Sequence, residues 1–131
     1  MTEKIRKHSF PDETYQIGID FDGVIHKNSK GFYDGTVYDD PVEDTRESLR
    51  LISKKYDIIV YSAKARKDRM LIDGKTGVEL IWDWLIKHDL NKYVKDVTAE
   101  KPRAVCYLDD KAIRFSSWDQ SIESLKNLKI L

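Results

Sequence analysis

A chain of 131 residues suits one domain with a proper hydrophobic core and leaves little room for a second module. Its 23 basic residues balance its 23 acidic residues, and this zero net charge argues against a dedicated nucleic-acid-binding protein, although local basic patches remain possible. The polar N-terminus lacks the apolar core of a signal peptide, and no apolar run approaches the roughly 20 residues of a membrane span. The single cysteine, Cys106, fits a reducing compartment, so we expect a cytoplasmic protein.

Strand-like and helix-like segments alternate along the chain after a polar lead-in over residues 1–14. The strand-like segments are short apolar runs, and they cover residues 15–21, 57–62, 94–98 and 104–108. Helix start signals follow at Asp40, Thr76 and Ser117. Asp40 can cap a helix, with Pro41 at its first position and Glu43 closing a capping box, and residues 76–79 contain a second capping box.

This alternation predicts βαβ units, and therefore a parallel sheet in a single Rossmann-like α/β domain over residues 1–131. The strands are apolar nearly throughout, which is typical of a sheet flanked by helices on both faces. We expect the last helix to turn Ile122 and Leu125 inward, and Cys106 to be a core thiol in mid-strand.

Polar side chains stand where three of the expected strands end: Asp20 and Asp22, then Ser62, then Asp109 and Asp110. Ligands of parallel α/β folds bind beyond the carboxyl ends of the strands. Isolated carboxylates are costly to bury, so these groups need a partner. A divalent cation together with a phosphate group is the candidate that these residue types favour.

The order and spacing of these elements resemble the haloacid dehalogenase superfamily of phosphotransferases. Residues 20–24 (Asp-Phe-Asp-Gly-Val) match its first motif, Ser62 its second, Lys101 its third, and the pair at 109–110 its fourth. The resemblance spans roughly residues 15–115, and it implies a fold of that superfamily without a cap domain.

The resemblance implies a role for each acidic residue. Asp20 would be the nucleophile that forms an aspartyl-phosphate, and Asp22 would protonate the leaving oxygen and then deprotonate the attacking water. Mg²⁺ would be held by Asp20 and Asp109, by the backbone carbonyl of Asp22, and by Asp110 as either a direct ligand or an outer neighbour. The second aspartate favours phosphoryl transfer over carbon–halogen cleavage, which needs no acid for its leaving group.

The same resemblance implies that Ser62 hydrogen-bonds a phosphoryl oxygen and that Lys101 neutralises the nucleophile and the transferred group. Gly23 would permit a tight turn after the first motif. In the basic stretch 63–75, Lys64 or Arg66 could meet an anionic part of the substrate, although a solvated loop is the alternative interpretation. Residues 25–40 could form a small flap, and a site this open could also be closed by a second subunit.

Three further features receive modest interpretations. His26 is expected in an exposed loop, and Asp39 with Asp40 is expected to serve helix capping instead of metal binding. Phe32 and Tyr33 are expected to be exposed aromatic residues on the flap.

The leading hypothesis is a Mg²⁺-dependent phosphatase that acts on a small phosphorylated metabolite, such as a sugar phosphate or a nucleotide. A nucleic-acid 3′-end phosphatase is a second enzymatic hypothesis, although the neutral net charge gives it no support. A non-catalytic signalling or binding domain phosphorylated on aspartate is the alternative from another class. In such receiver domains, however, the acidic pair ends the first strand and the lysine comes last, which is the reverse of the order here.

Overall fold

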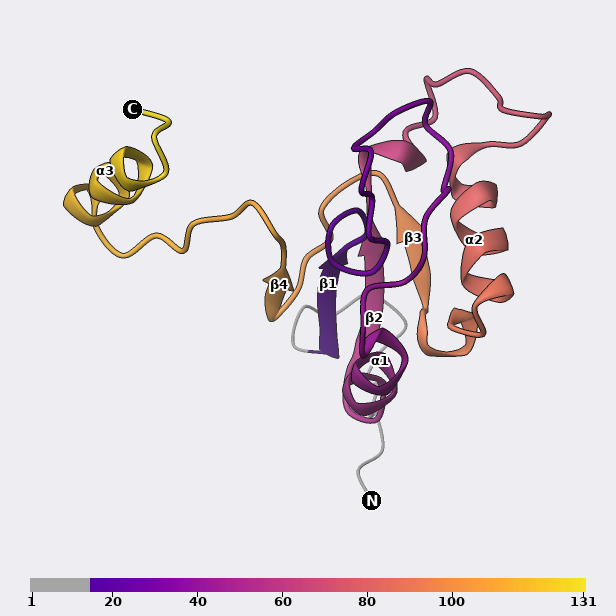
Figure 1. Cartoon of the computed structure of the whole chain (residues 1–131). Helices are drawn as coiled ribbons and strands as arrows, with labels where there is room; N and C mark the ends of the chain where they lie inside the picture. Colours follow the sequence, from indigo (N-terminus) through magenta and orange to yellow (C-terminus); the bar gives the residue numbers. More distant parts are fainter. Residues whose placement is uncertain (1–14) are drawn as a thin grey trace.

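The computed structural model describes residues 15–131, which contain one four-stranded parallel sheet with the strand order β3-β2-β1-β4 (Figure 1). The strands are β1 (Gln16–Asp20), β2 (Asp57–Tyr61), β3 (Asp96–Thr98) and β4 (Cys106–Leu108). The helices in this part of the chain are α1 (Thr45–Ser53), α2 (Gly77–Lys87) and α3 (Trp118–Asn127), with short 3₁₀ turns η2 (Ala63–Ala65) and η3 (Asn91–Tyr93). The α/β class and the parallel sheet are therefore confirmed, and the order of elements is compatible with a Rossmann-like fold.

The register of the sheet aligns the carboxyl ends of its strands. In β1, Ile19 stands beside Val60 of β2 on one side and beside Leu108 of β4 on the other. Because all three pairings are parallel, the residues that follow β1, β2 and β4 emerge at the same edge. This edge carries the polar residues that the sequence analysis singled out.

Both α1 and α2 cover the same face of the sheet. Ile19, Ile58 and Val60 point to that face and belong to one buried cluster with Leu49 of α1 and Ile81 of α2. The crossovers from β1 to β2 and from β2 to β3 run in the same direction, and the right-handed rule then places both helices on one side.

The opposite face is covered differently from our expectation of helices on both faces. Within residues 15–131, β3 connects to β4 through a segment without a helix, and this segment crosses the second face. Tyr107 donates a hydrogen bond to the carbonyl of Pro102 (2.6 Å), and Gln16 donates one to the carbonyl of Arg103 (2.8 Å). Gly18 permits this close cover, because a Cβ there would lie 2.8 Å from the Tyr107 ring.

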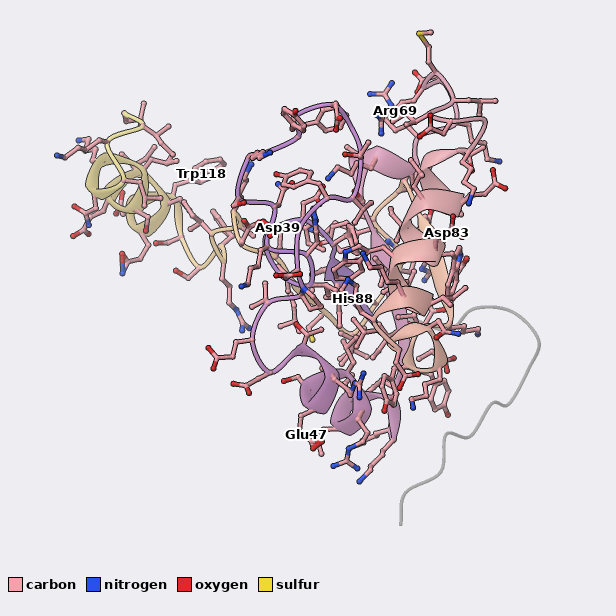
Figure 2. All side chains as sticks on the ribbon, turned by 45° about the vertical axis from the view of Figure 1, so that its right-hand side comes forward. Asp39, Glu47, Arg69, Asp83, His88 and Trp118 are labelled. Carbon is pink, nitrogen blue, oxygen red and sulfur yellow. The ribbon has the colours of Figure 1, made fainter. Side chains whose placement is uncertain are left out.

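Helix α3 stands apart from the sheet, beyond the edge strand β4 (Figure 1). Trp118, labelled in Figure 2, is 73 % exposed, and Ile122 is exposed as well, so the inward orientation expected for Ile122 is wrong. Cys106 in β4 is exposed as well, so the expectation that it is a core thiol is also wrong. β4 pairs only with β1 and has no helix packed on it within the described residues.

The first helix begins later than its start signal indicates. Residues 40–42 pair with residues 25–27 instead: Lys27 donates its N–H to the Asp40 carbonyl (3.0 Å), and Val42 donates to the Ile25 carbonyl (2.8 Å). These bonds hold the segment outside the helical conformation, so α1 starts at Thr45 after a left-handed Asp44 without a side-chain cap. The capping box predicted at Asp40 is therefore wrong.

The other two start signals are confirmed. Thr76 Oγ1 accepts a hydrogen bond from the Glu79 N–H (3.2 Å), and Glu79 Oε1 accepts one from the Thr76 N–H (2.9 Å), which completes the capping box of α2. Ser117 Oγ accepts from the Gln120 N–H (3.2 Å) at the start of α3. None of the helices described here combines the length and the apolar character required to cross a membrane.

We predict that Thr76→Ala lowers the free energy of unfolding by about 1 kcal/mol, because α2 packs on the core and loses its cap. Urea denaturation followed by circular dichroism measures this change. Ser117→Ala removes the same kind of cap from α3, which stands apart from the core, and should leave the main transition in place. Equal losses in the two variants would contradict the separation of α3 from the cooperative unit.

Candidate active site

Three carboxylates meet at the carboxyl edge of the sheet. One oxygen each of Asp20, Asp109 and Asp110 lies within 4.8 Å of the other two. Asp20 ends β1, while Asp109 and Asp110 directly follow β4, and the pairing of these two neighbouring strands brings the groups together. The structure thus gathers three of the four aspartates that the sequence analysis assigned to a metal.

Gly23 makes room for Asp110. A Cβ on Gly23 would lie 2.2 Å from Oδ2 of Asp110, which is far inside van der Waals contact. The same glycine has φ +88°, in the left-handed region where other residues are strained. The backbone conformation therefore favours glycine here, and a side chain at position 23 would displace the Asp110 carboxylate from its present position.

The Asp109 carboxylate is held by a donor on each oxygen. The Lys111 N–H donates to Oδ1 (2.9 Å), and the Tyr61 hydroxyl donates to Oδ2 (2.9 Å). The bond from the Lys111 backbone is the main cause of the lowered pKa of Asp109. Burial, followed by the bond to Asp109, raises the pKa of Tyr61, which therefore remains a donor. Sequence reasoning missed Tyr61, because it ends an apolar run and resembles a core residue.

Asp20 experiences the opposite effect. Its pKa rises from 3.8 to about 7, first because of burial and then because of the Asp109 charge, with further contributions from Asp110 and Asp22. This cluster of oxygen ligands suits a hard divalent cation such as Mg²⁺, which would compensate the charge that the carboxylates concentrate. The donor set therefore fits the predicted metal.

Asp22 lies outside this cluster of three. Its Oδ1 accepts hydrogen bonds from His26 Nδ1 (2.8 Å) and from the ammonium group of Lys64 (3.0 Å). Burial acts to raise the pKa of Asp22, and the bonds from His26 and Lys64 outweigh it, so that the pKa is lowered overall. The Asp22 carboxylate is thus bonded to His26 and Lys64 and does not belong to the cluster of Asp20, Asp109 and Asp110.

Two of those partners correct sequence-based expectations. His26 is fully buried, not exposed, because its ring stacks on Phe21 at 5.3 Å and both ring nitrogens have partners. Lys64 is also fully buried, so neither a solvated position nor a direct contact with substrate fits it. Arg66 is exposed and forms a two-point ion pair with Asp68, at 3.1 and 2.6 Å.

The loop that follows the first motif is closed by its own hydrogen bonds. Asp39 accepts bonds from the backbone and the hydroxyl of Ser29, and these bonds, the hydroxyl first, lower the pKa of Asp39 to about 2. Asp39, labelled in Figure 2, therefore closes the loop, and the expectation that it caps a helix is wrong. Phe32 and Tyr33 are exposed on this loop, as predicted.

The two residues assigned to the phosphate occupy different settings. Ser62 is buried, and its Oγ accepts from the Lys64 N–H (3.1 Å) as the cap of η2, which leaves its hydroxyl hydrogen able to donate. Lys101 is exposed, and its ammonium group lies 4.3 Å from the centre of the Tyr107 ring. The same ammonium group lies 5.9 Å from the centre of the ring of Tyr61, which is the hydrogen-bond donor to Asp109, and its charge is a minor contributor to the lowered pKa of Asp109.

The raised pKa of Asp20 predicts a pH-dependent stability without added metal. The native carboxyl has a pKa of about 7 against 3.8 for an unperturbed aspartate, so the contribution of Asp20 is fully present below pH 3.8 and is lost as pH rises to about 7. In EDTA, the melting temperature of the wild type minus that of Asp20→Asn should fall between pH 4 and 7. A difference that rises over this range would contradict the assignment.

Gly23→Ala tests the position of Asp110. We predict that Gly23→Ala lowers the affinity for Mg²⁺ by about 10–100-fold, because the added side chain displaces the Asp110 carboxylate. Isothermal titration calorimetry measures this affinity. Gly31→Ala is the matched control, because Gly31 also has positive φ (67°) but no atom lies within 4 Å of the position that a Cβ would take there. Equal Mg²⁺ affinities in the two variants would show that Gly23 does not serve Asp110.

Comparisons of this chain with known protein families, with curated proteins and with solved structures found no match. The geometry of the site is therefore the basis on which a function can be assigned.

Proposed function

We propose that the chain is a Mg²⁺-dependent phosphatase of the haloacid dehalogenase type, which hydrolyses phosphoric monoesters through an aspartyl-phosphate on Asp20. The observation that carries this proposal is the convergence of Asp20, Asp109 and Asp110 within 4.8 Å. The three residues come from two motifs that lie far apart in the sequence. The absence of a side chain at Gly23, which leaves space for the Asp110 carboxylate, is a further feature that a chance cluster of surface carboxylates would not explain.

The carboxylates of Asp20, Asp109 and Asp110 would hold the metal, and the backbone carbonyl of Asp22 is assigned to it by resemblance. When bound, Mg²⁺ supplies positive charge that offsets the repulsion between an anionic phosphate and an anionic nucleophile. An Asp20 oxygen attacks phosphorus, forming an oxygen–phosphorus bond as the bond to the leaving oxygen breaks. Water then attacks the same phosphorus, and the Asp20 carboxylate is released.

The remaining site residues bind the phosphoryl group and move protons. The Ser62 hydroxyl and the Lys101 ammonium group would bind phosphoryl oxygens, as donors aimed at charge that develops during transfer. Asp22 is assigned both proton transfers, to the leaving oxygen and from the attacking water. The lowered pKa of Asp22 supports the second of these, in which a carboxylate accepts a proton from water.

A small phosphorylated metabolite, such as a sugar phosphate or a nucleotide, fits this site better than a nucleic-acid end. Lys64 is buried and Arg66 is paired with Asp68, so neither offers an unpaired charge to a phosphate backbone. The exposed free thiol of Cys106 supports the proposal of a reducing compartment, the cytoplasm, as the site of the reaction.

Asp20→Asn tests the proposal directly. We predict that the wild type hydrolyses p-nitrophenyl phosphate only with Mg²⁺, that EDTA abolishes turnover, and that the variant loses about a thousandfold or more, because the nucleophile is gone. Released p-nitrophenol is followed by absorbance, and circular dichroism verifies the fold. Asp68→Asn, which changes an exposed carboxylate on the Arg66 pair, is the matched control and should retain activity.

Near-normal turnover in Asp20→Asn would overturn the proposed nucleophile, and activity that persists in EDTA would overturn the metal. The same assay, run over sugar phosphates, nucleotides and phosphate-ended oligonucleotides, identifies the substrate class. Turnover of an oligonucleotide should fall steeply with salt if the phosphate backbone contributes to binding.

A further inference from the structure

The two oxygens of the Asp22 carboxylate have different surroundings. Oδ1 accepts two hydrogen bonds, from His26 Nδ1 at 2.8 Å and from Lys64 Nζ at 3.0 Å. Oδ2 accepts none from residues 15–131, and the Asp22 side chain retains 20 % of its exposure. One oxygen is therefore fixed by buried donors, while the other remains available to a reactant.

Lys64 is unusual because its charge is fully buried yet has one carboxylate partner within the described chain, Asp22. Its ammonium group also lies 3.4 Å from Oδ1 of Asn28 and 5.7 Å from the centre of the Tyr38 ring. Burying an ammonium ion without a paired charge is strongly unfavourable. The position of Lys64 therefore constrains where the Asp22 carboxylate can lie.

His26 constrains the same oxygen from a second direction. The Asp39 N–H donates to His26 Nε2 (2.9 Å), so the proton of the neutral ring resides on Nδ1 and is donated to Asp22. The ring cannot turn freely, because it stacks on Phe21 and meets Trp84 edge-on at 5.5 Å. A buried aromatic packing thus orients the donor.

We infer that Lys64 and His26 are positioning residues that fix Oδ1 of Asp22, so that Oδ2 accepts the proton from the water that cleaves the aspartyl-phosphate. This inference rests on the proposed function. In the step, the water oxygen bonds to phosphorus, its proton passes to Oδ2 of Asp22, and the bond between phosphorus and Asp20 breaks. The products are inorganic phosphate and a free Asp20 carboxylate.

The step predicts which half of the reaction fails when a positioning residue is lost. Formation of the aspartyl-phosphate from an aryl phosphate needs little protonation of its good leaving group, whereas hydrolysis of the intermediate needs the base. General-base catalysis contributes about 10²–10⁴-fold, so misplacing Asp22 should slow hydrolysis by roughly tenfold to a hundredfold. The phosphoenzyme should then accumulate.

The experiment uses Lys64→Met, which keeps most of the apolar stem, and measures the phosphorylated fraction by intact mass after rapid acid quench with p-nitrophenyl phosphate and Mg²⁺. We expect phosphoenzyme to accumulate, a burst of p-nitrophenol, and kcat and KM to fall together. Lys67→Met, which changes an exposed basic residue of the same stretch, should show none of these changes. If Lys64→Met instead slows formation of the aspartyl-phosphate and no phosphoenzyme accumulates, Lys64 supports the site as a whole and the inference is overturned.

His26 provides a test that does not depend on the folding of Lys64→Met. In the wild type, long-range ¹H–¹⁵N spectra should show the His26 proton on Nδ1, and a proton on Nε2 would contradict the donor to Asp22. His26→Asn, which keeps an amide donor near Nδ1, should accumulate less phosphoenzyme than His26→Leu. If the wild type hydrolyses no phosphate ester, the proposed function fails; if it turns over but neither Lys64→Met nor His26→Leu accumulates phosphoenzyme, this inference alone fails.

Discussion

Repulsion among carboxylates at one edge of the sheet is the constraint on which the rest of the site depends. Parallel pairing of β1 with β4 brings Asp20 toward Asp109 and Asp110, and burial together with these neighbouring charges raises the pKa of Asp20. Such a cluster is stable only with protons or a cation to compensate it. The surrounding residues are organised around that requirement: Gly23 leaves the space, and Tyr61 holds Asp109 in place.

Asp22 lies outside the cluster, and its carboxylate is surrounded by hydrogen-bond donors, whereas Asp20 is surrounded by other carboxylates. The donors to Asp22 are buried so deeply that their own positions are fixed by packing. Two aspartates separated by a single residue therefore have pKa values that move in opposite directions, Asp20 upward and Asp22 downward. The difference follows from the partners: Asp20 is partly buried beside other carboxylates, whereas Asp22 accepts hydrogen bonds from His26 and Lys64.

The sequence was sufficient to predict the strands, the parallel sheet and the meeting of Asp20 with Asp109, because apolar runs and strand ends are local signals. It was insufficient for His26 and Lys64, whose burial depends on loops that pack against each other from distant parts of the chain. The start of α1 shows the same limit. The local helix-start signal at Asp40 was overridden by hydrogen bonds between residues 40–42 and residues 25–27, which nothing near Asp40 reveals.

The pairing of β1 with β4 has a consequence for how the molecule is made. Ile17 pairs with Cys106, so β1 emerges from the ribosome long before its outer neighbour. Contacts between residues so distant in sequence close slowly. The half of the chain that bears Asp20 therefore lacks the other two carboxylates of the cluster until β4 and the residues after it have been synthesised, and a nascent chain that stops before β4 holds only the acidic end of β1.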